Sequence, residues 1–191
     1  MSNKRNVPKA LAVFANPRAL CLAGLLAAMS LILGKFLQIP SPVSQVVRIS
    51  FENLPIILAG LTLGPVAGAM TGVVADLVGC ALYGYAINPM ITLGAAAVGL
   101  VAGLVGVLAK RLPLVPRVVL SVFAAHAVGS VLIKTVGLAR WYLAKMEMGY
   151  AQLTLYRAIN YLIVGALEAL LLCLLLRHRG VRGQLERMCK K

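Results

Sequence analysis

The chain has 191 residues, of which 61% are hydrophobic and only 13% are charged, and its mean hydropathy is +0.91. A water-soluble fold of this length cannot bury so much apolar surface, so the composition excludes a soluble globular protein and indicates an integral membrane protein. The net charge of +14 does not call for nucleic acid as a partner. The basic residues are gathered in short loops and tails, where membrane topology and anionic lipid account for them.

The apolar segments, taken in chain order, predict an all-α protein with six transmembrane helices. Runs close to the length that crosses a bilayer lie at 19–37, 54–82, 89–109, 118–139 and 156–176. The run 54–82 is too long for one span and contains Gly64-Pro65, where proline removes a backbone donor, so we divide it there. The second helix is then only about 14 residues long, so it is expected to be tilted, broken or shielded by its neighbours.

The basic residues predict that both termini are cytoplasmic. With six spans and the N-terminus inside, 13 Lys and Arg residues fall in cytoplasmic segments, against three (Arg48, Arg140 and Lys145) in outer segments. Lys and Arg are retained on the cytoplasmic side, so this imbalance sets the orientation. We therefore expect a basic cytoplasmic segment at 1–18, a six-helix transmembrane substrate-binding domain at 19–177 and a basic cytoplasmic tail at 178–191.

The chain lacks the motifs of an enzyme or of an energy source. It contains no GxxxxGK phosphate loop, no HExxH and no GxSxG, and its five acidic residues are scattered. Its four cysteines are far apart and have no histidine at ligand spacing, so no metal site and no disulfide framework is predicted. We predict a protein that is not an enzyme and has no cofactor.

Small residues recur every four positions along three of the predicted spans. Such spacing places them on one helix face and allows two backbones to approach closely. Packing within the chain is one explanation, and a docking face for another membrane subunit is the other. The longest stripe lies in the first span and is the best candidate for docking; it consists of Ala19, Ala23 and Ala27.

Charges near the outer edge of the membrane indicate a binding site that faces outward. Charged residues in or beside the hydrocarbon region are costly and usually functional. Four of the five charges in the outer half are cationic, the five being Lys35, Arg48, Glu52, Lys134 and Arg157. A cationic site suits a ligand with carboxylates, whereas snorkelling of long basic side chains to the interface is the alternative. Asp76, Glu168 and His126 are expected to serve helix packing.

The turn from Tyr83 to Pro89 is predicted to face outside and combines two tyrosines, a glycine and an amide. Pro89 suits the first turn of the fourth helix, with Asn88 as its N-cap. Aromatic residues at this level either anchor the protein at the interface or stack on a planar ligand. The second role would be shared with Trp141, Tyr142, Tyr156 and Tyr161, and the loop 38–50 is long enough to cover a pocket.

In this order and spacing, the motifs resemble the substrate-binding S components of energy-coupling factor (ECF) vitamin transporters. The matching elements cover most of 17–177 and are the alanine stripe, Arg48-Ile49-Ser50-Phe51, Gly64-Pro65-x-x-Gly68-x-x-x-Gly72 with Asp76-Leu77, the turn 88–94, and Arg157-Ala158-Ile159-Asn160 with Glu168. Within the family, the chain is most similar to the folate-binding subgroup.

The resemblance implies a high-affinity folate-binding subunit in the plasma membrane of a prokaryotic-type cell. It implies capture of the vitamin outside, followed by docking to a membrane T component that two cytosolic ATPases drive, with the alanine stripe as the docking contact. A pterin offers a planar face and a polar edge, and the glutamate tail of folate offers carboxylates. The expected contacts are Arg48, Lys134 and Arg157 for the tail or rim, Asn88, Thr92 and Asn160 for polar edges, and Tyr83 and Tyr85 for stacking.

Three alternatives stay open from the sequence. The chain could be an S component for riboflavin, pantothenate or another pterin, because subgroup boundaries depend on a few pocket positions. It could be an autonomous secondary transporter that uses an ion gradient and a midplane charge such as Asp76. The third alternative is a membrane enzyme that acts on lipid.

Overall fold

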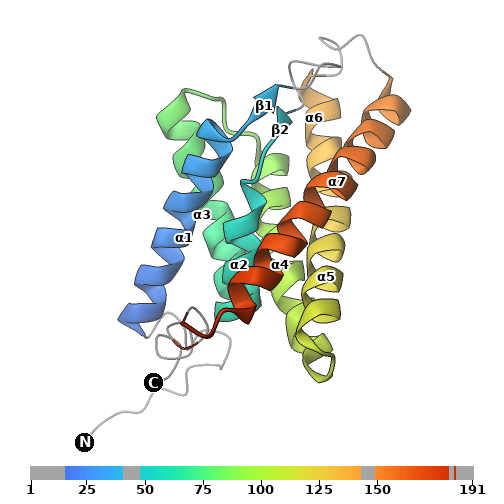
Figure 1. Cartoon of the computed structure of the whole chain (residues 1–191). Coiled ribbons are helices and arrows are strands. Elements are labelled where there is room, and N and C mark those ends of the chain that lie inside the picture. Colours follow the sequence, from blue (N-terminus) through green and yellow to red (C-terminus); the bar gives the residue numbers. More distant parts are fainter. Residues whose placement is uncertain (1–15, 41–47, 143–148, 181–182, 184–191) are drawn as a thin grey trace, which may run out of the picture.

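The computed structural model describes residues 16–40, 48–142, 149–180 and 183. These residues form a helical bundle (Figure 1), with helices α1 (Pro17–Phe36), α2 (Asn53–Leu63), α3 (Pro65–Tyr83), α4 (Pro89–Leu108), η2 (Ala109–Arg111), α5 (Leu114–Ala125), η3 (His126–Ile133), α6 (Lys134–Tyr142) and α7 (Tyr150–Arg177). The segments α5, η3 and α6 follow one another without a break. The six predicted helical spans are therefore confirmed, while most of the predicted tails 1–18 and 178–191 lies outside the described residues.

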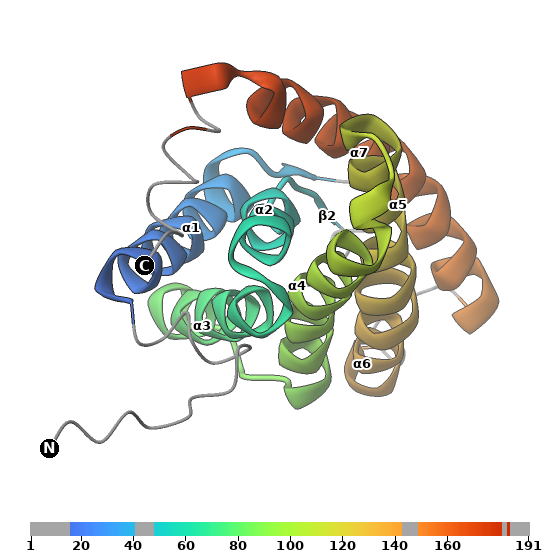
Figure 2. The same cartoon turned by 90° about the horizontal axis from the view of Figure 1, so that it is seen from below.

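Helix α2 is the short span that the sequence predicted, and it is shielded by its neighbours. Five helical stretches of the described chain are long and apolar enough to cross a membrane, whereas α2 has 11 residues. At 1.5 Å per residue it is about 16 Å long, roughly half the thickness of the hydrocarbon core. It contacts α1, α3, α4, α5 and α7, and Figure 2 shows it among these helices. Because nine of its residues are buried, α2 is shielded over most of its length.

The division of the long apolar run occurs at Gly64-Pro65, as predicted. Gly64 ends α2 with a φ of 101°, a left-handed conformation that glycine adopts without steric cost. Pro65 is the first residue of α3, where its missing N–H leaves no helical hydrogen bond unmade. The two residues together end one helix and begin the next.

Glycines bring the backbones of α2, α3 and α4 into direct contact. A β carbon at Gly99 of α4 would lie 2.1 Å from the carbonyl oxygen of Gly68 on α3. A β carbon at Gly68 would lie 2.6 Å from the Cα of Gly60 on α2. Such distances are shorter than any real contact of a β carbon, so only glycine fits. Packing within the chain therefore explains these small residues of the third and fourth spans.

The two ends of the bundle differ in structure and in charge. At one end, α1 begins, η2 joins α4 to α5, and α7 ends (Figure 1); exposed basic residues there are Arg18, Lys110, Arg111, Arg177 and Arg179. At the other end, β1 (Ile39–Pro40) pairs antiparallel with β2 (Arg48–Ile49), with Ile39 opposite Ile49. This short ladder is an addition to the predicted all-helical fold, and its two strands lie between α1 and α2 in the chain.

Candidate functional site

A cavity of about 290 Å³ lies between the helices, toward the end of the bundle that carries the ladder. Its lining comes from α1, α2, α3, α4, α6 and α7, so segments distant in the sequence build it together. Its volume is at the lower end of the range for small-molecule sites in proteins, about 300–1,000 Å³. The polar residues of the lining are Ser30, Gln38, Ser50, Glu52, Asp76, Tyr83, Tyr85, Lys134, Arg157 and Tyr161.

Small residues on α3 leave the space that the cavity occupies. Gly72, Ala75, Asp76 and Gly79 lie within two turns of one another, at spacings that place them on one helix face. A β carbon at Gly72 would lie 2.3 Å from the carbonyl oxygen of Ala95, because α3 and α4 touch there. Asp76 lies one turn after Gly72 on α3. The close contact of α3 with α4 at Gly72 therefore fixes the part of α3 from which the Asp76 carboxylate reaches the cavity.

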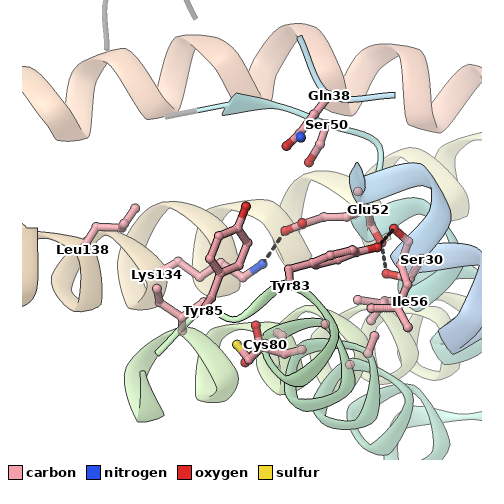
Figure 3. A pocket seen from close by; sticks show the side chains of 18 of the residues that line it. Ser30, Gln38, Ser50, Glu52, Ile56, Cys80, Tyr83, Tyr85, Lys134 and Leu138 are labelled. Atoms are coloured by element: carbon pink, nitrogen blue, oxygen red, sulfur yellow. Dashed lines mark hydrogen bonds and ion pairs between the residues drawn. The ribbon is translucent and has the colours of Figure 1, made fainter. Parts of the chain in front are cut away.

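Lys134 lines the cavity and is already paired with a carboxylate. Its Nζ donates to Glu52 Oε1 at 3.0 Å and lies 3.5 Å from Asn53 Oδ1, and Figure 3 shows the Lys134 and Glu52 side chains pointing toward one another. Lys134 is only 6% exposed. Its ammonium therefore does not snorkel to an interface, and Glu52 balances its charge within the chain.

Arg157 is a buried cation at the cavity and forms no ion pair with a carboxylate among the described residues. It is 4% exposed and comes from α7. Its Nη2 donates to the Ser130 carbonyl at 2.7 Å, and its guanidinium carbon lies 5.3 Å from the centre of the Tyr161 ring. Its Nε has no hydrogen-bond partner among the described residues, and no described carboxylate forms an ion pair with it. A buried charge without a counterion is costly, so this group favours an anionic ligand.

Asp76 serves helix packing, as expected, through a hydrogen bond between α3 and α4, and it also lines the cavity. It accepts a hydrogen bond from Thr92 Oγ1 at 2.5 Å, and Thr92 itself is not part of the lining. The Thr92 hydroxyl therefore helps to hold the Asp76 carboxylate in place without lining the cavity itself. The spacing of Asp76 from Gly72 and Gly79 could have revealed its position, since these residues share a helix face. Glu52, Asp76, Lys134 and Arg157 together line one site with two carboxylates and two cations.

Tyrosines of α3 and the following turn line another part of the cavity. The Tyr83 and Tyr85 rings are tilted by 53°, and their centres are 6.1 Å apart. Tyr83 donates to the Leu31 carbonyl at 3.2 Å, and the Lys35 ammonium lies 4.8 Å from the centre of its ring. Figure 3 shows both rings beside Lys134 and Glu52. Lys35 is not among the lining residues and is held against Tyr83 instead.

Two further predicted site residues, Asn88 and Asn160, lie outside the lining. Asn88 is the N-cap of α4, as predicted: its Oδ1 accepts from the Met90 N–H at 3.0 Å, and its Nδ2 donates to the Gly137 carbonyl at 3.3 Å. Asn160 is buried on α7. Arg48 lies on β2, and the structure describes only its backbone. Of the eight predicted ligand contacts, those found in the lining formed by described side chains are Tyr83, Tyr85, Lys134 and Arg157.

The alanine stripe of α1 faces the interior of the bundle. Ala19 and Ala27 are 2% and 4% exposed, and Ala23 is half-buried. Ala19 packs with Leu63 and Ala67 of the neighbouring helices. The stripe therefore contributes to packing within the chain, and the small residues that α1 exposes are others, among them Gly24 and Ala28.

Comparison with known proteins identifies a family and a shared fold. The model of the family described as "ECF transporter, substrate-specific component" matches residues 18–176. No curated protein sequence matches significantly. Among solved structures, the chain is similar to FolT bound with folic acid, with a TM-score of 0.60 and 24% sequence identity; the match covers 81% of this chain and 89% of that chain. At this identity, the likeness to FolT establishes the fold.

Proposed function

Because the chain belongs to the family of ECF transporter substrate-specific components, we propose that it captures folate from outside the cell and delivers it to a T component driven by two ATPases. As a member of this family it is an integral membrane protein that binds a transported substrate, and it is not an enzyme. The observation that carries the choice of folate is Arg157, a buried cation at the cavity that forms no ion pair with a carboxylate among the described residues.

The polar groups of the cavity match the two ends of folate. The glutamate tail carries carboxylates, which the guanidinium of Arg157 would bind through charge-assisted hydrogen bonds. The pterin ring carries an amino group and a ring N–H along one edge, and the Asp76 carboxylate would accept hydrogen bonds from such donors. The rings of Tyr83, Tyr85 and Tyr161 would pack against its planar face. The shared fold of FolT bound with folic acid also supports this assignment.

Other vitamins match this set of groups less well. Thiamine is a cation and would leave the charge of Arg157 without an anion. Riboflavin has a planar ring but no carboxylate, whereas pantothenate has a carboxylate but no ring for the tyrosines. A site that contains the Asp76 carboxylate and a cation without an ion pair among the described residues favours a ligand that carries an anion and a donor-rich planar ring.

Calorimetric titration of the detergent-purified chain tests the choice of substrate. We expect folate to bind with a 1:1 stoichiometry without ATP or any partner protein, and riboflavin, thiamine, pantothenate and biotin to give no heat of binding. A thermal unfolding transition measured on the same sample shows that the protein is folded. Tight binding of another vitamin, or of none by folded protein, would contradict the proposal.

We assign the surface that docks to the T component to the exposed face of α1. Gly24 and Ala28 are exposed, small and one turn apart, and no atom lies within 4 Å of a β carbon placed at Gly24. Close approach of another helix needs such a pair. The basic end of the bundle, where α1 begins, would lie in the cytoplasm, and the cavity would face outward.

Substituting both residues by leucine should separate binding from transport. The double variant Gly24→Leu with Ala28→Leu is expected to keep the folate affinity of the wild type but to lose folate uptake in cells that also express the T component and the ATPases. Ala166→Leu, at an exposed position of α7, is the matched control and should change neither. Normal uptake by the double variant would show that docking uses another face.

A further inference from the structure

Three polar side chains form a buried network that does not belong to the cavity lining. His126 begins η3 and is 2% exposed, and Glu168 of α7 is 0% exposed. The His126 Nε2 lies 2.6 Å from Glu168 Oε2, and its Nδ1 lies 3.2 Å from the hydroxyl of Ser130. Both ring nitrogens therefore have partners, and the ring is held in one orientation.

Ser130 connects this network to Arg157. The Ser130 hydroxyl contacts His126, while the Ser130 carbonyl accepts a hydrogen bond from Arg157 Nη2 at 2.7 Å. In a regular α-helix, this carbonyl would accept from the N–H of Lys134. Here the Lys134 N–H donates to Gly129, five residues back, because η3 is a π-helical segment. Such segments are rare and are frequent at functional sites.

Tyr161 is a second connection between His126 and Arg157. Its ring stacks on the His126 ring, with centres 4.9 Å apart and planes inclined by 25°. The Arg157 Nη2 lies 3.5 Å from the Tyr161 hydroxyl, and its guanidinium lies 5.3 Å from the centre of the ring. Ser130 and Tyr161 both contact the Arg157 guanidinium, and both also contact His126.

A hydrolytic role for Ser130, His126 and Glu168 does not fit their position. The set has the composition of a serine hydrolase triad, in which the serine must reach the substrate. Ser130 is fully buried, and none of the three lines the cavity. Their contacts lead to Arg157, and none of the three side chains reaches the cavity itself.

We infer that His126 and Glu168 are a positioning pair that, through Ser130 and Tyr161, aims the Arg157 guanidinium at a carboxylate bound in the cavity. This inference rests on the proposed function. Nη2 of Arg157 is held by the chain itself and Nε is buried, while Nη1 makes no hydrogen bond to a described residue and is the donor left for a ligand. Since guanidinium donors lie in a fixed planar fork, a small rotation would misalign those that meet the carboxylate.

A double-mutant cycle tests whether the pair acts through Arg157. The variant His126→Phe with Glu168→Met removes both polar partners together and keeps a ring against Tyr161, a replacement that buried pairs often tolerate. We expect it to fold, to lose about 10-fold in folate affinity and to keep its affinity for 6-methylpterin, which has no carboxylate. In an Arg157→Met background, the same pair should change folate affinity by less than about twofold.

The outcomes separate positioning from general stabilisation. An equal loss for folate and 6-methylpterin, or an undiminished loss in the Arg157→Met background, would overturn the inference. If the double variant does not fold, Ser130→Ala cuts the same network at one hydrogen bond and should lower folate affinity alone, by about threefold. Folate binding by the wild type is measured first, so failure of the proposed function is recognised independently of the cycle.

Discussion

Replacing Arg157 by methionine is expected to lower folate affinity about 100-fold and to change 6-methylpterin affinity by less than about threefold. Each hydrogen bond to a charged group contributes about 1.5–3 kcal/mol and a 100-fold change in affinity is about 2.7 kcal/mol, so loss of one or two such bonds accounts for the effect. The variant should unfold at the same or a higher temperature, because it removes a buried cation without a carboxylate partner among the described residues. Calorimetry and thermal unfolding in detergent measure the two effects.

Arg140→Met is the matched control for this experiment. Arg140 is an exposed cation of α6 near the end of the bundle that carries the cavity, so its substitution makes the same change in net charge without touching the lining. Its folate affinity should stay within about twofold of the wild type, because charges exposed to solvent are strongly screened. If Arg157→Met bound folate as tightly as the wild type, the carboxylates would have to bind another group, such as Lys134.

Gly99→Ala should be among the most destabilising single substitutions in the chain. The added methyl group would lie 2.1 Å from the carbonyl oxygen and 2.2 Å from the carbonyl carbon of Gly68, and only separation of α3 from α4 relieves these contacts. We expect a cost of about 3 kcal/mol or more, the upper part of the range for overpacking. Folate binding should also weaken, because Gly72 and Ala95, one turn along the same contact, line the cavity.

Gly24→Ala is the control, since it adds the same methyl group in the middle of α1 with no atom within 4 Å. Glycine is about 1 kcal/mol less favourable than alanine inside a helix, so this variant should unfold at the same or a higher temperature. Thermal unfolding and the monodisperse fraction after purification report on both variants. Similar stability of the two would show that α3 and α4 adjust their separation freely.

Local rules were sufficient to predict the helices. Each signal used for the helices lies within a short stretch of the chain. These signals are the long apolar runs, Gly64-Pro65 at the junction of two helices and Asn88-Pro89 at the start of another, so the helix boundaries could be predicted from them directly. The short length of α2 was also predicted, but the sequence left it open whether this helix is tilted, broken or shielded by its neighbours.

The spacing of the small residues on α1 did not decide whether they face the interior of the bundle or its surface. Ala19, Ala23 and Ala27 form a helix stripe whatever surrounds them, and the sequence left packing and docking as alternatives. The burial of Ala19 and Ala27 depends on where α2 and α3 pack against α1. Helical periodicity defines a face, but only tertiary contacts decide what covers it.

Composition and hydrophobic length therefore determined the class of the protein, its six helices and the presence of cations near one end. Only the tertiary structure decided which charges pair and which remain available to a ligand. Glu52 and Lys134 are 82 residues apart and meet through the packing of α2 against its neighbours, while Arg157 forms no ion pair with any carboxylate that the structure describes. The physical reason is that Coulomb interactions depend on distance in space and on burial, neither of which the order of residues specifies.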